Sequence, residues 1–340
     1  NTTANDNTAI GHAALGNNTT GSQNVAVGRG ASAYNTTADF NTAVGFYALL
    51  NATTGFSNTA IGYTSQQNCT EGNNNTSIGR ETLFTNTLGD RNVAIGYRSL
   101  YLYNRTSSHD SYNVGVGNES LYSTTTGAYN TAVGGLALYS NTTANSNVAF
   151  GYQALNANTT GTINTAAGVN SMLTNTTGSR NSAFGGESLG SNTTGDYNCA
   201  FGKATLYSNT TGDNNTAYGT GALFANTTAS NNTAIGYEAL KLNTTGTANV
   251  AVGYGALDAN TTADNNTAVG QGSLSASTTA AQCTAIGTSS LAGVTTASDN
   301  TGLGVNAGSA ITTGVHNTCV GRNGGSGITT GTNNVTLGNF

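Results

Sequence analysis

The sequence predicts an all-β fold, a β-solenoid (parallel β-roll) of twenty coils with 17 residues each. Three observations predict it. A five-residue phrase of the type Asn-Thr-Ala-Ile-Gly recurs at a fixed spacing, its side chains alternate with the period of two that is typical of a strand, and it always ends in Gly. A coil of 17 residues cannot bury its few apolar side chains alone, so each coil must be stabilised by its neighbours.

The phrase begins at residues 7, 24, 41, 58, 75 and 92, and then at 113 and every seventeen residues up to 334. We number the positions of each coil from this first residue. Residues 1–340 therefore form a single continuous repeat array, in which the one longer interval indicates a four-residue insertion within 101–112. At roughly 4.8 Å per coil, the whole array would extend over about 100 Å.

Each part of the coil has a predicted structure. Positions 2–4 form a strand, and the Gly of position 5, as in Gly11, Gly28 and Gly45, provides a bend, since Gly adopts positive φ without penalty. A second strand is expected at positions 8–10, where Leu15 and Leu49 occupy position 9. Positions 12–15, commonly Asn-Thr-Thr-Gly, form the return turn.

Two rows of side chains are expected to hold the coils together. Position 1 is Asn in nineteen coils, as in Asn7, Asn24 and Asn41, and stacked Asn side chains can form a ladder of amide hydrogen bonds. Side chains at positions 2, 4 and 9 are expected to fill a thin core, and position 3 then points outward. Because position 3 is nearly always Ala, Gly or Ser, we expect another copy of the chain to pack closely against it.

The composition agrees with this architecture and excludes other classes of protein. The chain has no proline, which would interrupt ladder hydrogen bonds, and only 7% of its residues are charged. No apolar run reaches the ~18 residues of a membrane span, and 9 Lys and Arg against 14 acidic residues leave no basic patch. We therefore expect neither a nucleic-acid partner nor membrane insertion of this segment.

Residues 24–33, Asn-Val-Ala-Val-Gly-Arg-Gly-Ala-Ser-Ala, resemble the head repeats of trimeric autotransporter adhesins. The wider pattern Asn-Thr-Ala-x-Gly-x-x-Ala-Leu, followed by Asn-Thr-Thr-Gly, resembles repeats of bacteriophage tail fibres and bacterial surface fibre proteins. The resemblance implies a left-handed parallel β-roll, a homotrimer, and an extracellular location on a cell surface or a virion fibre. The adhesin repeats have a shorter period than the 17 residues found in this chain.

The predicted function is mechanical, a structural rod in an extracellular fibre or adhesin. The alternative is a receptor- or glycan-binding tail fibre or adhesin head. Ice binding is a remote alternative, because the pattern lacks an outward Thr-x-Thr face. No enzyme and no cofactor are expected, because His12, His109 and His316 lie many coils apart. Asp196 and Asp213, one period apart, could form at most a weak Ca²⁺ site.

Candidate sites are of three kinds. Tyr and Phe recur at positions 6 and 10 and are expected to stack as rungs or, alternatively, to contact sugars. The insertion is the best candidate for a specific ligand contact, through Tyr101, Tyr103, Arg105 and His109. The Asn-x-Thr sequences at position 12 predict a row of exposed N-glycosylation acceptors, namely Asn18, Asn35, Asn141, Asn158, Asn175, Asn192, Asn209, Asn226, Asn243 and Asn260.

The four cysteines occupy four different positions of the coil. The closest pair is two coils apart, roughly 10 Å along the axis and beyond the reach of a disulfide, so none is expected to pair within the chain. A bridge between chains at Cys319, in the row of small residues, is the alternative. In the altered coils 283–340, position 12 becomes Val294, Ile311 and Ile328 while Gly308 and Gly325 take position 9, which predicts a changed cross-section.

Overall fold

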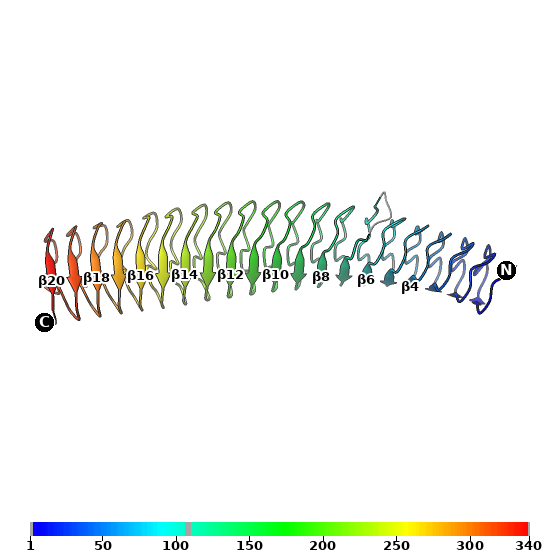
Figure 1. Ribbon diagram of the computed structural model, residues 1–340, viewed down its shortest axis with the longest axis horizontal. Coiled ribbons are helices and arrows are strands. Elements are labelled where there is room, and N and C mark those ends of the chain that lie inside the picture. The colour runs from blue at the N-terminus through cyan, green and yellow to red at the C-terminus, as the bar shows by residue number, and fades with distance from the viewer. Residues whose placement is uncertain (1–2, 106–109, 339–340) are drawn as a thin grey trace. The chain divides into compact units, whose positions relative to one another are not determined.

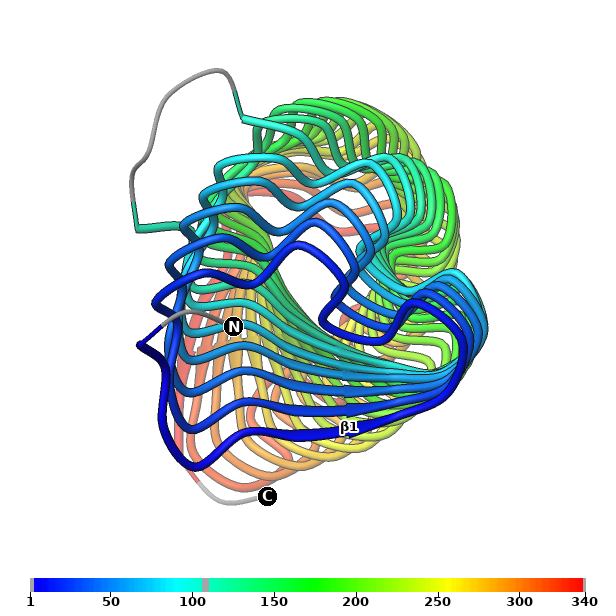
Figure 2. The same cartoon turned by 90° about the vertical axis from the view of Figure 1, so that its right-hand side faces the viewer.

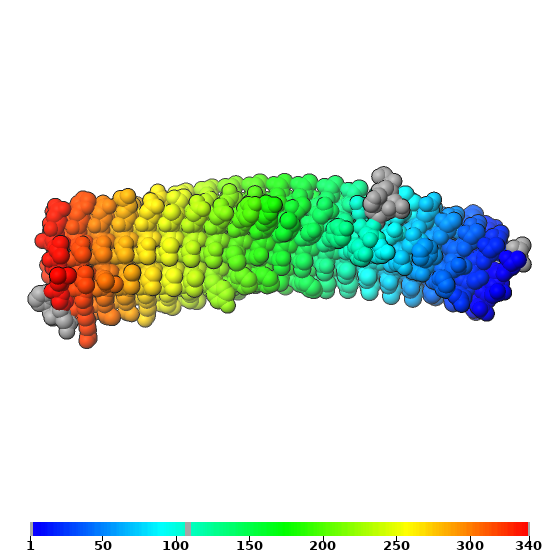
Figure 3. Space-filling view, in the orientation of Figure 1, coloured from blue at the N-terminus to red at the C-terminus, as the bar shows by residue number. Residues whose placement is uncertain are grey.

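A computed structural model describes residues 3–105 and 110–338, which fold as a parallel β-solenoid without a helix among them. The chain divides into two compact units, residues 1–170 and 171–340. Seen end-on in Figure 2, a coil of the first unit is one loop of backbone with its strand along one side. Figure 3 shows the surface of the second unit as parallel ridges toward its C-terminal end.

Every coil contributes one short strand at positions 2–4, in chain order along each unit (Figure 1). In the first unit the described strands are β1 (Thr8–Ile10), β2 (Val25–Val27), β3 (Thr42–Val44), β4 (Thr59–Ile61), β5 (Thr76–Ile78), β6 (Val93–Ile95), β7 (Val114–Val116), β8 (Thr131–Val133), β9 (Val148–Phe150) and β10 (Thr165–Ala167). In the second unit they are β11 (Ser182–Phe184), β12 (Cys199–Phe201), β13 (Thr216–Tyr218), β14 (Thr233–Ile235), β15 (Val250–Val252), β16 (Thr267–Val269), β17 (Thr284–Ile286), β18 (Thr301–Leu303), β19 (Thr318–Val320) and β20 (Val335–Leu337).

Within each unit, consecutive strands pair in parallel and in register. Thr8 lies opposite Val25, and Val25 lies opposite Thr42, so the sequence period is also the structural period. The register continues across the insertion, where Val93 lies opposite Val114. The predicted solenoid and its strand at positions 2–4 are therefore confirmed.

The second strand expected at positions 8–10 is wrong, because these residues form turns. Position 9 has a left-handed backbone even where it is leucine, with φ of 50° at Leu49 and 54° at Leu240, and position 7 has one too, as at Tyr47. A left-handed residue other than Gly costs about 1–2 kcal/mol. Full burial of a leucine side chain contributes about 1.5–3 kcal/mol, and both Leu49 and Leu240 are completely buried, so the core offsets the backbone strain.

The assignment of the strand faces is the reverse of the expectation. The alanines of position 3, such as Ala43 and Ala234, are fully buried, whereas Ile61 and Ile235 of position 4 are 37% and 41% exposed. The reason is space, since the leucine of position 9 and the small residue of position 8 already occupy the interior, where only a methyl-sized side chain fits. The row of small residues is therefore a core feature, and packing of a second chain against it is wrong.

The Gly of position 5 meets two constraints at once. At Gly236 φ is 135°, a value that side chains other than hydrogen rarely allow. A Cβ atom built there would lie 2.5 Å from the carbonyl oxygen of Gly253 in the next coil, far inside van der Waals contact. Gly11, Gly28 and Gly45 have the same conformation and the same close approach, so the predicted bend is confirmed.

The predicted ladder at position 1 is confirmed, although most of its hydrogen bonds join side chains to the backbone. The Asn24 Oδ1 atom accepts a hydrogen bond from the Asn41 backbone N–H at 2.9 Å. The Asn24 Nδ2 atom donates to the Ala38 carbonyl at 2.8 Å. Asn7 begins the row in the same way, and Asn113 N–H reaches Asn92 Oδ1 at 3.2 Å across the insertion. Each buried amide thus satisfies the first backbone N–H of the next coil and a turn carbonyl of its own coil.

In the altered coils near the C-terminal end, apolar side chains at position 12 fill core space that a leucine at position 9 fills in most other coils. Val294 and Ile311, at position 12, are completely buried, and Ile328 is half-buried. A Cβ atom built on Gly308 would lie 2.6 Å from the Leu291 Cδ2 atom and 3.1 Å from the Ile311 Cδ1 atom. Leu291 of the preceding coil and Ile311 therefore occupy the space next to position 9, and glycine there avoids overpacking.

The amide ladder should contribute measurably to stability. Asn249→Ala removes the acceptor of the Asn266 N–H (3.0 Å) and the donor to the Ala263 carbonyl (2.8 Å), both in the interior. The Asn266 N–H is then left without an acceptor, whereas the Ala263 carbonyl keeps its hydrogen bond from Asn260 Nδ2 at 3.1 Å. The free energy of unfolding should therefore fall by about 1–3 kcal/mol. Urea unfolding followed by circular dichroism measures it, with exposed Thr262→Ala of the same coil as the control. Equal midpoints for the two variants would contradict the role of the ladder.

Candidate binding site at the insertion

The ten asparagines expected to accept glycans are buried, not exposed. Their exposed fractions are between 0% and 3%, and their amides form a second ladder inside the turn. Asn209 Nδ2, for example, donates to Asn192 Oδ1 at 2.8 Å and to the Gly212 carbonyl at 3.0 Å. The expected exposure of Asn18, Asn35, Asn141, Asn158, Asn175, Asn192, Asn209, Asn226, Asn243 and Asn260 is therefore wrong. In the folded coil the amide is not accessible for a sugar.

The aromatic rows stack along the axis, as the first of the two interpretations predicts. Tyr101 lies between Phe84 and Tyr122, with ring centroids 5.3 Å apart on either side and nearly parallel planes. Phe46 and Tyr63 at position 6 stack in the same way at 5.3 Å. Rings inside such a stack contact each other with both faces, so only a ring at the end of a stack can offer a face to a ligand.

A charged cluster lies beside these rings in the coils before the insertion. Arg98 Nε donates to Glu81 Oε2 at 2.6 Å, and Arg80 Nε donates to Oε1 at 2.9 Å. The Arg98 guanidinium also lies 5.2 Å from the centre of the Tyr101 ring, within the range of a cation–π contact. Burial raises the pKa of Glu81, but the hydrogen bonds and charges of Arg98 and Arg80 outweigh it and hold this pKa below its usual value.

The residues proposed at the insertion separate into different environments. Tyr101 belongs to the aromatic stack, and Tyr103 is completely buried, where burial raises the pKa of its hydroxyl. The Arg105 Nη1 atom donates to the Asp110 carbonyl at 3.3 Å. His109 lies outside the described residues. Among those of the four residues that the structure describes, Arg105 is the one that lines an open cavity.

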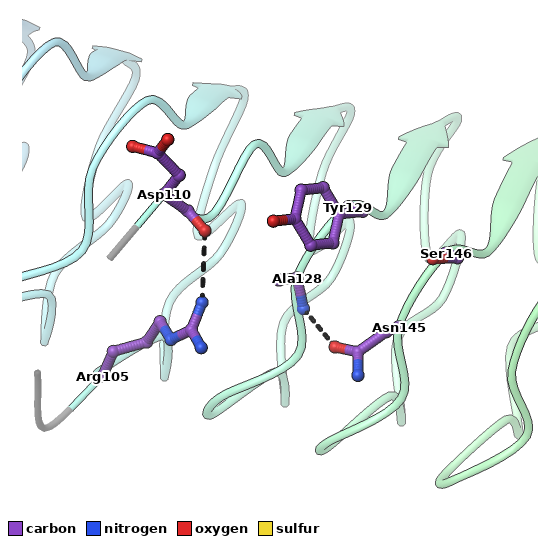
Figure 4. A pocket seen from close by; sticks show the side chains of 6 residues that line it. All are labelled: Arg105, Asp110, Ala128, Tyr129, Asn145 and Ser146. Carbon is purple, nitrogen blue, oxygen red and sulfur yellow. Dashed lines mark hydrogen bonds between the residues drawn. The ribbon is translucent and has the colours of Figure 1, made fainter. Parts of the chain in front are cut away.

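This cavity has a volume of about 570 Å³ and is lined by Arg105, Asp110, Ala128, Tyr129, Asn145 and Ser146. Figure 4 shows Arg105 and Asp110 on one side of Tyr129, with Asn145 and Ser146 on the other. The insertion supplies the first pair, and the following two coils supply the other residues. Asn145 is held by its Oδ1 atom, which accepts a hydrogen bond from Ala128 N–H at 2.7 Å.

Position 17 provides the aromatic wall of the cavity. Tyr112 and Tyr129 stack with centroids 5.9 Å apart, and Arg91 covers the Tyr112 ring at 5.5 Å. Asp110 forms an ion pair with Arg91 and accepts a hydrogen bond from the Tyr112 hydroxyl at 3.2 Å. Tyr129 and Asn145 were not among the predicted ligand contacts. The recurrence of Tyr at position 17, in Tyr112 and Tyr129, is the sequence signal that could have indicated them.

The acidic residues of position 16 have a structural role. Asp213 Oδ1 accepts a hydrogen bond from the Asp196 N–H at 2.7 Å, so this stacked pair holds the turns of adjacent coils together. Among the residues that the structure describes, no three His, Cys, Asp or Glu side chains gather where they could hold a metal ion. None of the described residues forms a helix long and apolar enough to cross a membrane.

Two cysteines replace ladder residues, at positions 12 and 1, one lies on the outer face, and one lies in the core row of position 3. Cys69 Sγ donates to the Gly72 carbonyl at 3.5 Å in place of an asparagine, and burial raises the pKa of its thiol to about 11. Cys319 is completely buried at position 3, so the alternative of a bridge between chains at this residue is wrong. Cys199 is half-buried at position 2 of β12, and all four thiols are free.

No protein-family model matches the sequence, and no curated protein matches it. The function therefore has to be inferred from the repeat, the coil geometry and the cavity at the insertion.

The cluster around Glu81 predicts a pH dependence of stability. Because the pKa of Glu81 is lower in the folded chain than in the unfolded chain, its ion pairs stabilise the fold above the unfolded pKa. This stabilisation is lost as the pH falls through the folded pKa. Glu81→Gln should lower the melting temperature near pH 7 and flatten its decline below about pH 5. Exposed Glu187→Gln is the control, and identical pH profiles for wild type and Glu81→Gln would refute the effect.

Proposed function

We propose that the chain is a structural rod of an extracellular fibre or adhesin, located on a cell surface or a virion. The observation that carries this proposal is the repetition of one buried amide ladder from coil to coil, as between Asn24 and Asn41 or Asn249 and Asn266. Stability in such an array is a sum over coils and their interfaces, which suits extension rather than the shaping of one deep site. The resemblance to adhesin and tail-fibre repeats supports the same role.

Self-association is part of this proposal, but through a different face than position 3. Parallel sheets normally have both faces covered. Here the outer face of the strands, positions 2 and 4, carries no charged residue in any of the twenty coils. It exposes large apolar side chains such as Ile61, Phe150 and Ile235, at 37%, 47% and 41%. A second copy has the same coil spacing and can stay in register along this face. We propose a homo-oligomer, a trimer of left-handed coils as the resemblance implies.

The second candidate function is binding of a host receptor or glycan, as in a tail fibre or adhesin head. The observation that favours it is the cavity beside the insertion, the only place where the repeat interval changes. The stacked rows of rings, such as Phe84 with Tyr101, favour it less, because those ring faces already contact each other.

Size and mass test the rod and its self-association together. We expect an elongated particle in electron micrographs and a mass of several times the 34.0 kDa of one chain in light scattering. Ile235→Lys on the outer face should reduce the mass to that of one chain, because a buried unpaired charge at an interface is costly. Thr245→Lys, exposed on the turn, is the control and should not change it. A globular particle would contradict the rod, and a monomeric wild type would contradict the oligomer.

Thiol reactivity provides a separate test of the covered face. Cys199 lies on the outer face, whereas Cys69, Cys283 and Cys319 are buried, and buried thiols react slowly. In the monomeric Ile235→Lys variant we expect one thiol per chain to react with a disulfide reagent before unfolding. In the wild-type oligomer that thiol should react on the order of tenfold more slowly, because the second chain covers it. Equal rates in the two proteins would contradict coverage of this face, and Cys199→Ser identifies the reacting thiol.

A further inference from the structure

The cavity at the insertion combines an available aromatic face with an unneutralised positive charge. Along position 17, the stack of Tyr112 and Tyr129 ends because the next coil has Ser146 there. One face of Tyr129 contacts the Tyr112 ring. The other is not covered by a ring and lines the cavity, and the side chain is 56% exposed. Tyr129 is therefore a stack-terminating ring that can pack on a flat or ring-shaped ligand.

The charges of the cavity do not balance. Asp110 is already paired with Arg91 and accepts from the Tyr112 hydroxyl. Among the described residues, Arg105 has no carboxylate partner. Its Nη1 atom donates instead to the backbone carbonyl of Asp110. Residues 106–109 contain no Asp or Glu that could neutralise it. A planar guanidinium in this situation is suited to bind a carboxylate with two parallel hydrogen bonds.

The opposite side of the cavity offers neutral polar groups. Asn145 Oδ1 is occupied by the Ala128 N–H, which orients the amide, and its Nδ2 atom has no partner among the described residues. Ser146 adds a hydroxyl next to it. The volume of about 570 Å³ is within the range of roughly 300–1,000 Å³ that is typical of small-molecule sites. The cavity thus offers an apolar wall, one cation and neutral hydrogen-bonding groups.

We propose that this cavity binds an acidic sugar, a pyranose ring that carries a carboxylate. The apolar face of the sugar ring packs on Tyr129, its carboxylate binds Arg105, and its hydroxyl groups bind Asn145 and Ser146. This ligand class rests on the second candidate function, glycan binding, and is independent of the rod and of its oligomeric state, because every lining residue comes from adjacent coils of one chain.

Two sugars that differ in one group test the ligand class. Methyl glucuronide and methyl glucoside share the pyranose ring, but only the first has a carboxylate. Titration of the intact chain followed by NMR should show at least tenfold tighter binding of the glucuronide, and this preference should decrease at high salt. Equal affinities would overturn the acidic class while glycan binding stands. Binding of neither sugar would overturn both, and leave the rod proposal unaffected.

Variants assign the contacts. Arg105→Gln should reduce the affinity for the glucuronide to that for the glucoside, while Tyr129→Ser should abolish measurable binding of both sugars. Arg180→Gln and Tyr197→Ser are the control variants and should leave binding unchanged. They remove the same residue types from the other unit, where the Arg180 guanidinium lies 5.1 Å from the centre of the Tyr197 ring. Circular dichroism shows whether each variant is folded. A folded Arg105→Gln variant that keeps the glucuronide preference would overturn the proposal.

Discussion

The buried amide of position 1 is the interaction on which the rest of the solenoid depends. Each Asn side chain accepts from the first N–H of the next coil and donates to a turn carbonyl of its own coil, as buried Asn24 does with Asn41 and Ala38. These bonds require successive coils to be close together and in register. That closeness in turn excludes any side chain at Gly236 and its equivalents, and makes the Gly of position 5 obligatory. The proline-free composition with only 7% charged residues follows from the same constraint.

The period, the strand and its register could be predicted from the sequence, because each depends on spacing alone. Which face of the strand lies inside could not. Alternation shows that Thr42 and Val44 point away from Ala43, but it does not show where the core is. The answer depends on Leu49, whose left-handed backbone turns its side chain into the interior and leaves room only for small neighbours. Leucine is rare in that conformation, so no sequence rule would have suggested it.

The candidate site was predictable only in part for a similar reason. The interrupted period indicated the insertion, and with it Arg105. Tyr129 and Asn145 come from the following two coils and meet Arg105 only because the solenoid stacks residues that are far apart in the chain. The sequons at position 12 show the opposite error. Asn209 has the residues of a glycosylation site, but the turn uses its amide as an internal hydrogen-bonding group.

The hydrogen bond from Asn113 to Asn92 spans 21 residues instead of 17, and the strands on either side keep their register. A coil is joined to its neighbours by fixed positions, and the length of chain between those positions is free. Segments can therefore be gained or lost at a turn without disturbing the framework. For the rod and the binding site proposed above, evolution of a recognition surface and conservation of the scaffold would then be separate problems, and contacts could change one coil at a time.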